Sequence, residues 1–279
     1  MAYDIVIVGG RVINGAGTPW TRADIAIKDG VIVELGYLKH PQADIIIKAE
    51  DLFVCPGFID IHNHSDLALL IDPIADSMIR QGVTTLTVGN CGLSVAPVKR
   101  EFIELFKKHV ESFAPAPVEW KWESFDEYLR ALEGKGVGVN VVPFVGHGTI
   151  RAMVLGFEPK EPSENELNQM KLLVEESMKA GAFGLTTGLI YLPGMYAKTS
   201  EIIELAKVVA KYGGIYASHI RSESFALIEA VAEAIEIGAK ANIPVEISHH
   251  KASGVENWGK VKTTLKMMED ARINNIEIT

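Results

Sequence analysis

The spacing of hydrophobic positions divides the chain into a β-rich first part and a longer part in which strands and helices alternate. Short β-rich runs separated by glycine-containing turns cover 4–8, 11–14, 24–28, 31–35 and 45–48. From residue 52 onward, the pattern changes to repeated strand-then-helix units. We therefore predict the N-terminal part of a small β-sandwich over residues 1–54 and an α/β domain over residues 55–279.

The second part reads as a series of parallel strands connected by helices. The predicted strands are 58–64, 84–91, 139–147, 183–191, 215–221, 244–251 and the start of a strand at 276–279. The predicted helices are 73–81, 124–133, 164–180, 199–212, 224–241 and 259–272. Repeated βα units with apolar strands indicate a parallel sheet whose faces are covered. This pattern predicts a TIM-like (β/α)8 barrel, truncated after six to seven strands and open at its edges, with a doubly wound open sheet as the alternative.

Local signals refine these elements. Ser163 and the pair Thr199-Ser200 are expected to begin helices, and Gly181 is expected to end one in a left-handed conformation. The segment 94–137 is too long for a simple crossover, and we predict an insertion there. It could form a lid over the barrel mouth or pack against the barrel.

Composition and charge exclude several classes of protein. The chain is 48% hydrophobic and 23% charged, and 27 basic against 36 acidic residues give a net charge of −9. No basic run, signal segment or long apolar stretch is present, so neither nucleic acid nor a membrane is an expected partner. With only Cys55 and Cys91, a cytoplasmic location is expected, and Cys55 is predicted to be a small buried hydrophobe.

Potential metal ligands stand at the ends of four predicted strands. His62 and His64 are two residues apart, so on a strand both side chains would point to one face. Cys91, His219 and His249 follow at the ends of later strands, where a (β/α)8 barrel builds its active site. Imidazole and thiolate are ligands that zinc prefers. Five such ligands are too many for one open tetrahedral site, but they fit two adjacent sites that share the thiolate.

Several motifs together carry a family resemblance. They are 54–64, 89–92, 188–194, 218–221 and 247–251. The chain resembles the N-terminal half of the D-aminoacylases, the N-acyl-D-amino-acid deacylases of the amidohydrolase superfamily. The first motif alone would also fit urease-like, hydantoinase-like and dihydroorotase-like enzymes. Those relatives commonly bridge their metals with a carboxylated lysine from the fourth strand, but 183–191 contains no lysine and Cys91 takes that role.

The resemblance implies zinc-dependent hydrolysis of N-acyl-D-amino acids to a carboxylate and the free D-amino acid. It implies that Cys91, His219 and His249 hold a tight zinc ion, and that His62 and His64 hold a weaker second one. The family's general acid/base aspartate would lie beyond Thr279, so activity of this chain alone is in question.

The resemblance also suggests roles around the metals. Tyr191 and Lys251 would orient the carbonyl and carboxylate of the substrate, although Tyr191 could equally be an aromatic residue on the rim. Arg221 could contact the substrate or pair with Glu223. His249 is preferred over its neighbour His250 as the ligand, because Lys251 would share a face with His249.

Two further residues have open roles. Asp66 could orient a first-strand histidine or be an exposed loop acid. His147 ends the third predicted strand and is a weaker candidate for substrate contact.

Two other functions compete with the deacylase. One is a hydantoinase- or dihydroorotase-like cyclic amidohydrolase, against which Cys91 argues. The other is a non-catalytic barrel subunit that associates through its open edge. The expected partners are therefore a small N-acyl amino acid, and a complementary C-terminal chain or further copies of this chain.

Overall fold

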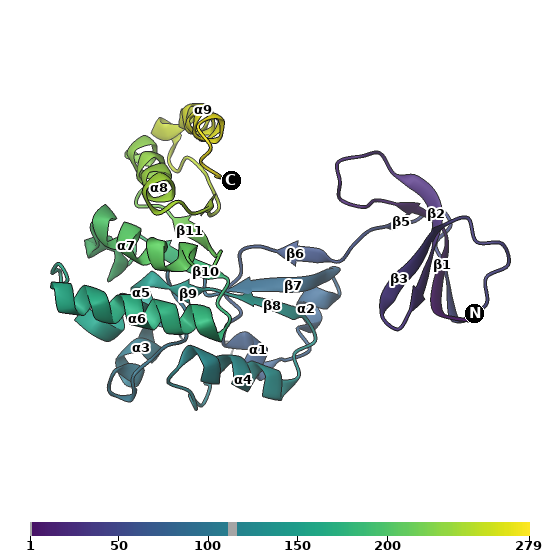
Figure 1. Cartoon of the computed structure of the whole chain (residues 1–279), viewed down its shortest axis with the longest axis horizontal. Helices are drawn as coiled ribbons and strands as arrows, with labels where there is room; N and C mark the ends of the chain where they lie inside the picture. Colours follow the sequence, from purple (N-terminus) through teal and green to yellow (C-terminus); the bar gives the residue numbers. More distant parts are fainter. Residues whose placement is uncertain (1, 111–115) are drawn as a thin grey trace. The chain divides into compact units, whose positions relative to one another are not determined.

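The computed structural model describes residues 2–110 and 116–279 and consists of two compact units (Figure 1). The first unit is Met1–Phe58 and the second is Ile59–Thr279. The boundary predicted from the sequence, after residue 54, lies a few residues earlier.

The N-terminal unit is a single five-stranded sheet. Its strands are β1 (Tyr3–Val12), β2 (Thr21–Lys28), β3 (Val31–Gly36), β4 (Ala43–Lys48) and β5 (Phe53–Val54). They follow the order β3-β2-β1-β4, with β5 also paired to β1. The runs 4–8 and 11–14, expected as separate strands, are both part of β1. Gly9 has a φ of 74° and the register shifts between Ile7 and Gly10, so the two glycines form a bulge instead of a turn.

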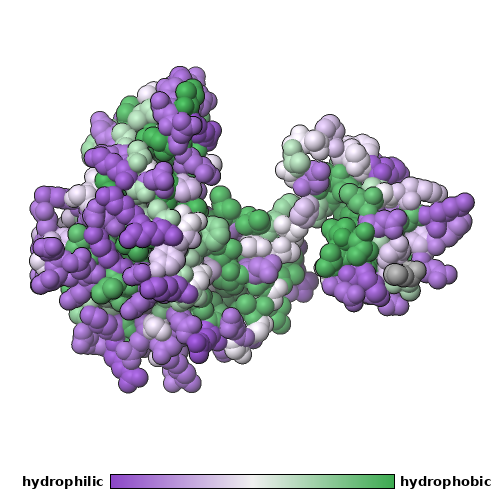
Figure 2. Space-filling model, viewed as in Figure 1, coloured by the Kyte–Doolittle hydropathy of each residue, from purple (hydrophilic) through white to green (hydrophobic). Residues whose placement is uncertain are grey.

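This sheet has a small core and much exposed apolar surface. Val6, Ala26 and Leu38 form its buried cluster. Large exposed hydrophobic side chains lie along β3 and β4: Val31, Ile32, Val33, Leu35, Ile45, Ile46 and Ile47. Hydrophobic residues are accordingly visible on the surface of this unit in Figure 2.

The second unit contains two short sheets. Its strands are β6 (Phe58–Asp60), β7 (Val83–Val88), β8 (Asn140–Pro143), β9 (Val145–Gly146), β10 (Gly184–Gly188), β11 (Ile215–His219) and β12 (Val245–Ile247). One sheet is β6-β7-β8 and the other is β12-β11-β10-β9, with only Phe144 between β8 and β9 in the chain. The pairs β7–β8, β9–β10, β10–β11 and β11–β12 are parallel, as predicted. The seventh predicted strand is reduced to a parallel bridge from Ile278 to Val245.

Helices follow the strands. The α-helices are α1 (Ala68–Ile71), α2 (Asp76–Ile79), α3 (Ile103–Val110), α4 (Phe125–Lys135), α5 (His147–Leu155), α6 (Glu164–Ala180), α7 (Thr199–Ala210), α8 (Leu227–Ala241) and α9 (Lys260–Ile273). Short 3-10 turns are η1 (Arg100–Phe102), η3 (Gly194–Tyr196) and η4 (Val255–Asn257). Among the described residues, none of these helices has both the length and the apolar character needed to cross a bilayer.

Two predicted helix starts and one predicted helix end agree with the structure. Ser163 caps α6 through a reciprocal capping box with Glu166, and Gly181 ends that helix with a φ of 118°. The predicted start at Thr199-Ser200 is confirmed, since α7 begins at Thr199; its cap residue is Lys198, which makes no side-chain capping bond. Helix α5 was missed altogether.

The segment 94–137 packs into the main core along the part of it that the structure describes; residues 111–115 lie outside the described residues. Phe106, Trp122, Phe125 and Tyr128 are buried members of this core. The Trp122 indole donates a hydrogen bond to the carbonyl of Val95 at 2.8 Å. The described parts of this segment therefore pack against the rest of the second unit.

A buried ionic cluster joins α5 to α7. Glu201 accepts a hydrogen bond from the guanidinium of Arg151 and lies 2.8 Å from Nε2 of His147. All three side chains are buried. Burial opposes ionisation of Glu201, but the contacts with His147 and Arg151 keep its pKa below the usual value.

We expect Glu201→Gln to destabilise the second unit by about 3–5 kcal/mol, because it leaves the buried Arg151 cation without its counter-charge. Glu204→Gln on the same helix is the matched control. Glu204 pairs with Lys171 and Lys207 near the surface, so its loss should cost about 1 kcal/mol or less. Urea unfolding of both variants measures the difference, and similar losses would contradict the role of the cluster.

Candidate metal centre

A tight turn after β7 carries Cys91. The turn places Cys91 at a φ of 54° and Gly92 at a φ of 73°. A Cβ on Gly92 would lie 2.7 Å from the amide nitrogen of Gly188, and a Cβ on Gly188 would lie 2.1 Å from the carbonyl oxygen of Cys91. The backbone of the turn therefore rests directly on the end of β10, and only glycine fits at either position.

His62 and His64 lie just beyond a strand instead of on it. Strand β6 ends at Asp60, so the predicted strand over 58–64 is too long, although both rings do turn toward the same group of potential ligands. The turn is held instead by Asp60, whose carboxylate accepts from the amide of His62 and from the side chain of Asn63. The ring centroids of the two histidines are 5.4 Å apart.

The Asn90 side chain connects this turn to the Cys91 turn. Its amide donates to the carbonyls of Asn63, at 3.0 Å, and Thr87, at 3.1 Å. This role for Asn90 was not predicted from the sequence. The only feature of the sequence that could have indicated it is that Asn90 precedes Cys91.

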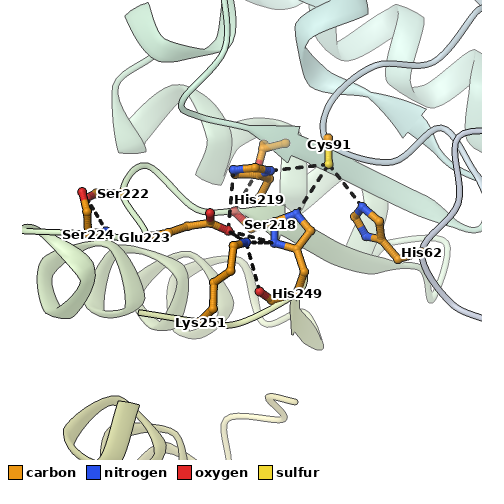
Figure 3. Close-up of polar contacts among 10 residues, drawn as sticks. His62, Cys91, Ser218, His219, Ser222, Glu223, Ser224, His249 and Lys251 are labelled. Atoms are coloured by element: carbon orange, nitrogen blue, oxygen red, sulfur yellow. Dashed lines mark hydrogen bonds and ion pairs between the residues drawn. The ribbon is translucent and has the colours of Figure 1, made fainter. Parts of the chain in front are cut away.

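The Cys91 thiol lies at the centre of the cluster (Figure 3). Its sulfur is 3.3 Å from Nε2 of His62, 3.6 Å from Nδ1 of His219 and 3.8 Å from Nε2 of His249. Two groups of potential ligand atoms each lie within 4.8 Å of one another: His62, His64 and Cys91, and Cys91, His219 and His249. All five predicted metal ligands thus meet in one place, with Cys91 common to both groups.

Burial disfavours the charged form of four of these donors, His62, His64, Cys91 and His219. It lowers the pKa of His62 and of His219 to about 4 and also lowers that of His64. The neighbouring rings add to the effect on His62, whereas Glu223 opposes it for His219. Burial, with the charges of Glu223 and Glu246, raises the pKa of the Cys91 thiol to about 12. Neutral imidazoles are ready ligands, and a cation at this position would favour the thiolate.

His249 and His250 face opposite sides, as expected of adjacent residues. His249 has a φ of 42° and reaches the thiol, whereas Nε2 of His250 is 2.9 Å from the hydroxyl of Thr264 in α9. This placement favours His249 as the ligand. The left-handed backbone of Cys91 and His249 carries a strain of about 1–3 kcal/mol per residue, as is common at functional sites.

Tyr191 and Lys251 stand beside the cluster. The Tyr191 ring is 4.8 Å from the ring of His219 in an edge-on contact, and its side chain is partly exposed. The Lys251 ammonium contacts the carboxylate of Glu223 and lies 3.1 Å from Nδ1 of His249. Both side chains therefore border the same space as the predicted ligands.

Arg221 is engaged within the protein. Its guanidinium donates two hydrogen bonds to Glu233, at 2.9 Å each, and others to the carbonyls of Met195 and Ala197. Its expected alternative partner, Glu223, instead lies against His249 and Lys251. Arg221 thus ties the loop after Tyr191 to α8.

The structure also decides between the environments expected for Cys55, Asp66 and His147. Cys55 is exposed, so its prediction as a buried hydrophobe is wrong; it lies in the link between β5 and β6. Asp66 is buried, which rules out an exposed loop acid; burial raises its pKa to about 7. His147 is fully buried against Glu201 at the start of α5, so its predicted contact with a substrate is not supported.

Comparison with known proteins places this centre in context. No family model matches the chain. It is 37% identical over 276 residues to the D-aminoacylase of Alcaligenes xylosoxydans xylosoxydans, covering 96% of this chain and 55% of that protein. It is 38% identical over 269 residues to the N-acyl-D-aspartate deacylase of the same organism, covering 96% and 53%.

Solved structures of related deacylases are also similar to this chain. The N-acyl-D-glutamate deacylase of Bordetella bronchiseptica, complexed with zinc and a phosphonate mimic of the tetrahedral intermediate, matches with a TM-score of 0.92 at 33% identity, over 100% of this chain and 58% of that one. The L-hydantoinase of Arthrobacter aurescens matches with a TM-score of 0.59 at 16% identity, over 99% and 57%, which shows a shared fold alone.

The fold is therefore of the amidohydrolase α/β type. Within that class, the chain belongs to the D-aminoacylase family, as its motifs predicted. It spans about half the length of the curated relatives it matches.

We expect Gly92→Ala to distort the Cys91 turn, since the new Cβ would meet the Gly188 amide at 2.7 Å. Gly136→Ala is the control, because Gly136 also has a positive φ, of 66°, but faces open space. The control should lose about 1 kcal/mol of stability, and Gly92→Ala at least about 2 kcal/mol more, in denaturant unfolding. Equal losses would mean that the turn does not depend on this close approach.

Proposed function

We propose that this protein acts in the zinc-dependent hydrolysis of the amide bond of N-acyl-D-amino acids, giving a carboxylate and the free D-amino acid. One observation carries the proposal: the Cys91 thiol, which follows β7, is surrounded by histidines at or just beyond the ends of β6, β11 and β12. The printed activities of the relatives supply the substrate class.

The donor set fits zinc. We propose that Cys91, His219 and His249 hold a tight ion and that His62 and His64, sharing Cys91, form a weaker second site. Sulfur and neutral imidazole are the ligands that zinc prefers. The zinc complex of the Bordetella deacylase supports the choice of metal, and a binuclear centre is described for D-aminoacylase.

A zinc ion supplies two things to amide hydrolysis, since it lowers the pKa of water and polarises a carbonyl. The chain's own residues would orient the substrate. The Tyr191 hydroxyl, whose pKa burial raises, stays protonated and can donate to the substrate carbonyl. The half-exposed Lys251 ammonium can attract the substrate carboxylate. Arg221 would act indirectly, by holding the loop that carries Tyr191.

A cyclic-amide hydrolase of the hydantoinase kind is the less favoured function. Its bridging lysine would come from the fourth strand, but β10 (Gly184–Gly188) contains none. Cys91 occupies the centre of the cluster instead.

We also propose a fuller architecture, in which the α/β unit is part of a (β/α)8 barrel and the N-terminal sheet is part of a β-sandwich. The apolar side chains exposed on β3, β4 and β6 support further packing partners. A complementary C-terminal chain or segment would cover them and would supply the general acid/base aspartate that the family resemblance implies.

Cys91→Ala should remove the tightly held zinc, whereas Cys55→Ala should not, because only Cys91 lies among the histidines. The measurement is zinc per chain by elemental analysis after dialysis, with circular dichroism to confirm folding. About one zinc per chain is expected for the unmodified protein and for Cys55→Ala. Equal zinc in the two variants would contradict the assignment of the site.

Adding a C-terminal half from a relative tests catalysis itself. Hydrolysis of an N-acyl-D-amino acid by the mixture, lost in Cys91→Ala, is the expected result. A zinc-loaded mixture that forms a complex but stays inactive would instead favour a non-catalytic barrel subunit.

A further inference from the structure

Glu223 has a position that the proposed reaction does not use. One of its carboxylate oxygens, Oε1, is 2.8 Å from Nδ1 of His249 and 3.7 Å from Nε2 of His219. The same oxygen contacts the ammonium of Lys251. Figure 3 shows the carboxylate directed toward these side chains, on the side of the rings away from Cys91. The Glu223 side chain is only 12% exposed.

The two histidines use opposite nitrogens toward the thiol. His219 approaches Cys91 with Nδ1 and His249 approaches it with Nε2. The remaining nitrogen of each ring therefore faces Glu223. A neutral imidazole carries one ring proton, and the nitrogen without it is the one that can bind a metal.

We propose that Glu223 is a positioning residue that selects these two opposite tautomers and thereby sets the affinity of the Cys91–His219–His249 site for zinc. This inference rests on the proposed zinc site. Nδ1 of His249 has two neighbours, the Glu223 carboxylate at 2.8 Å and the Lys251 ammonium at 3.1 Å. Because the ammonium donates to the same carboxylate, Nδ1–H of His249 is free to donate to Glu223, and the lone pair of Nε2 is left for the metal. Oε1 of Glu223 is 3.7 Å from Nε2 of His219, which is too far for a hydrogen bond, so its effect on this ring is electrostatic. The negative carboxylate favours a proton on Nε2, the nearer ring nitrogen. Carboxylates behind ligating histidines raise ligand basicity and hold the rings in orientation.

The carboxylate is built into the site. The carbonyl of Glu223 accepts a hydrogen bond from the amide of Ser253 at 2.7 Å, which ties the loop after β11 to the loop after β12. The Lys251 ammonium forms an ion pair with the carboxylate and reduces the cost of burying its charge. Glu223 thus joins the loop that follows His219 to the loop that carries His249.

The test compares zinc affinities by competition with a chelator at neutral pH. Glu223→Ala should weaken zinc binding about 10–100-fold, and Glu223→Gln, which keeps an acceptor but no charge, should fall in between. Glu236→Ala is the control: this carboxylate on α8 pairs with Lys240 at the surface and should change zinc affinity less than about threefold.

A second readout needs no metal. Long-range ¹⁵N–¹H spectra of the zinc-free protein should place the ring proton of His249 on Nδ1, and Glu223→Ala should shift it toward Nε2. Zinc affinity and tautomers unchanged in Glu223→Ala would overturn the positioning role. Absence of zinc binding by the unmodified chain would instead overturn the proposed function, so the two failures are distinct. If Glu223→Ala does not fold, Glu223→Gln carries both measurements.

Discussion

The candidate centre depends on backbone-to-backbone contact between the turn after β7 and the end of β10. Gly92 and Gly188 leave no space for a side chain at this contact, where the nearest approaches of an added Cβ would be 2.7 Å and 2.1 Å. Strand β7 belongs to one sheet and β10 to the other, so this contact also joins the two sheets. The thiol of Cys91 is thereby held at a fixed point between His62 from the first sheet and His219 and His249 from the second.

The site combines strain and burial in a way that folding alone would not favour. Cys91 and His249 have left-handed backbones, and burial disfavours charge on the thiol and on the imidazoles of His62, His64 and His219. Each feature costs stability in the isolated protein. A bound cation would be stabilised by the neutral imidazoles and would offset the cost of the thiolate. A bound metal would therefore offset the free-energy cost of the backbone strain and of the buried thiolate. This is the physical reason for favouring a metal centre over an accidental cluster.

The sequence predicted the order of elements and the five candidate ligands better than it predicted their local geometry. Period and spacing identified most strands and helices, because apolar parallel strands and amphipathic helices leave clear patterns. The helix α5 was missed because its residues are buried on nearly every side, so it has no polar face to reveal it. His62 and His64 were expected on a strand, but the Asp60 carboxylate ends β6 by capping the turn, and such a local side-chain contact leaves no periodic signal.

The roles of polar residues around the site were harder to predict, since partners far apart in sequence decide them. Arg221 was expected to face the substrate or Glu223, but Glu233, twelve residues on along the chain, takes two of its hydrogen bonds. Because Arg221 also holds the carbonyls of Met195 and Ala197, it fixes the loop that places Tyr191 beside His219. The Tyr191 ring thus keeps its place next to the candidate ligands through a partly buried ion pair between Arg221 and Glu233.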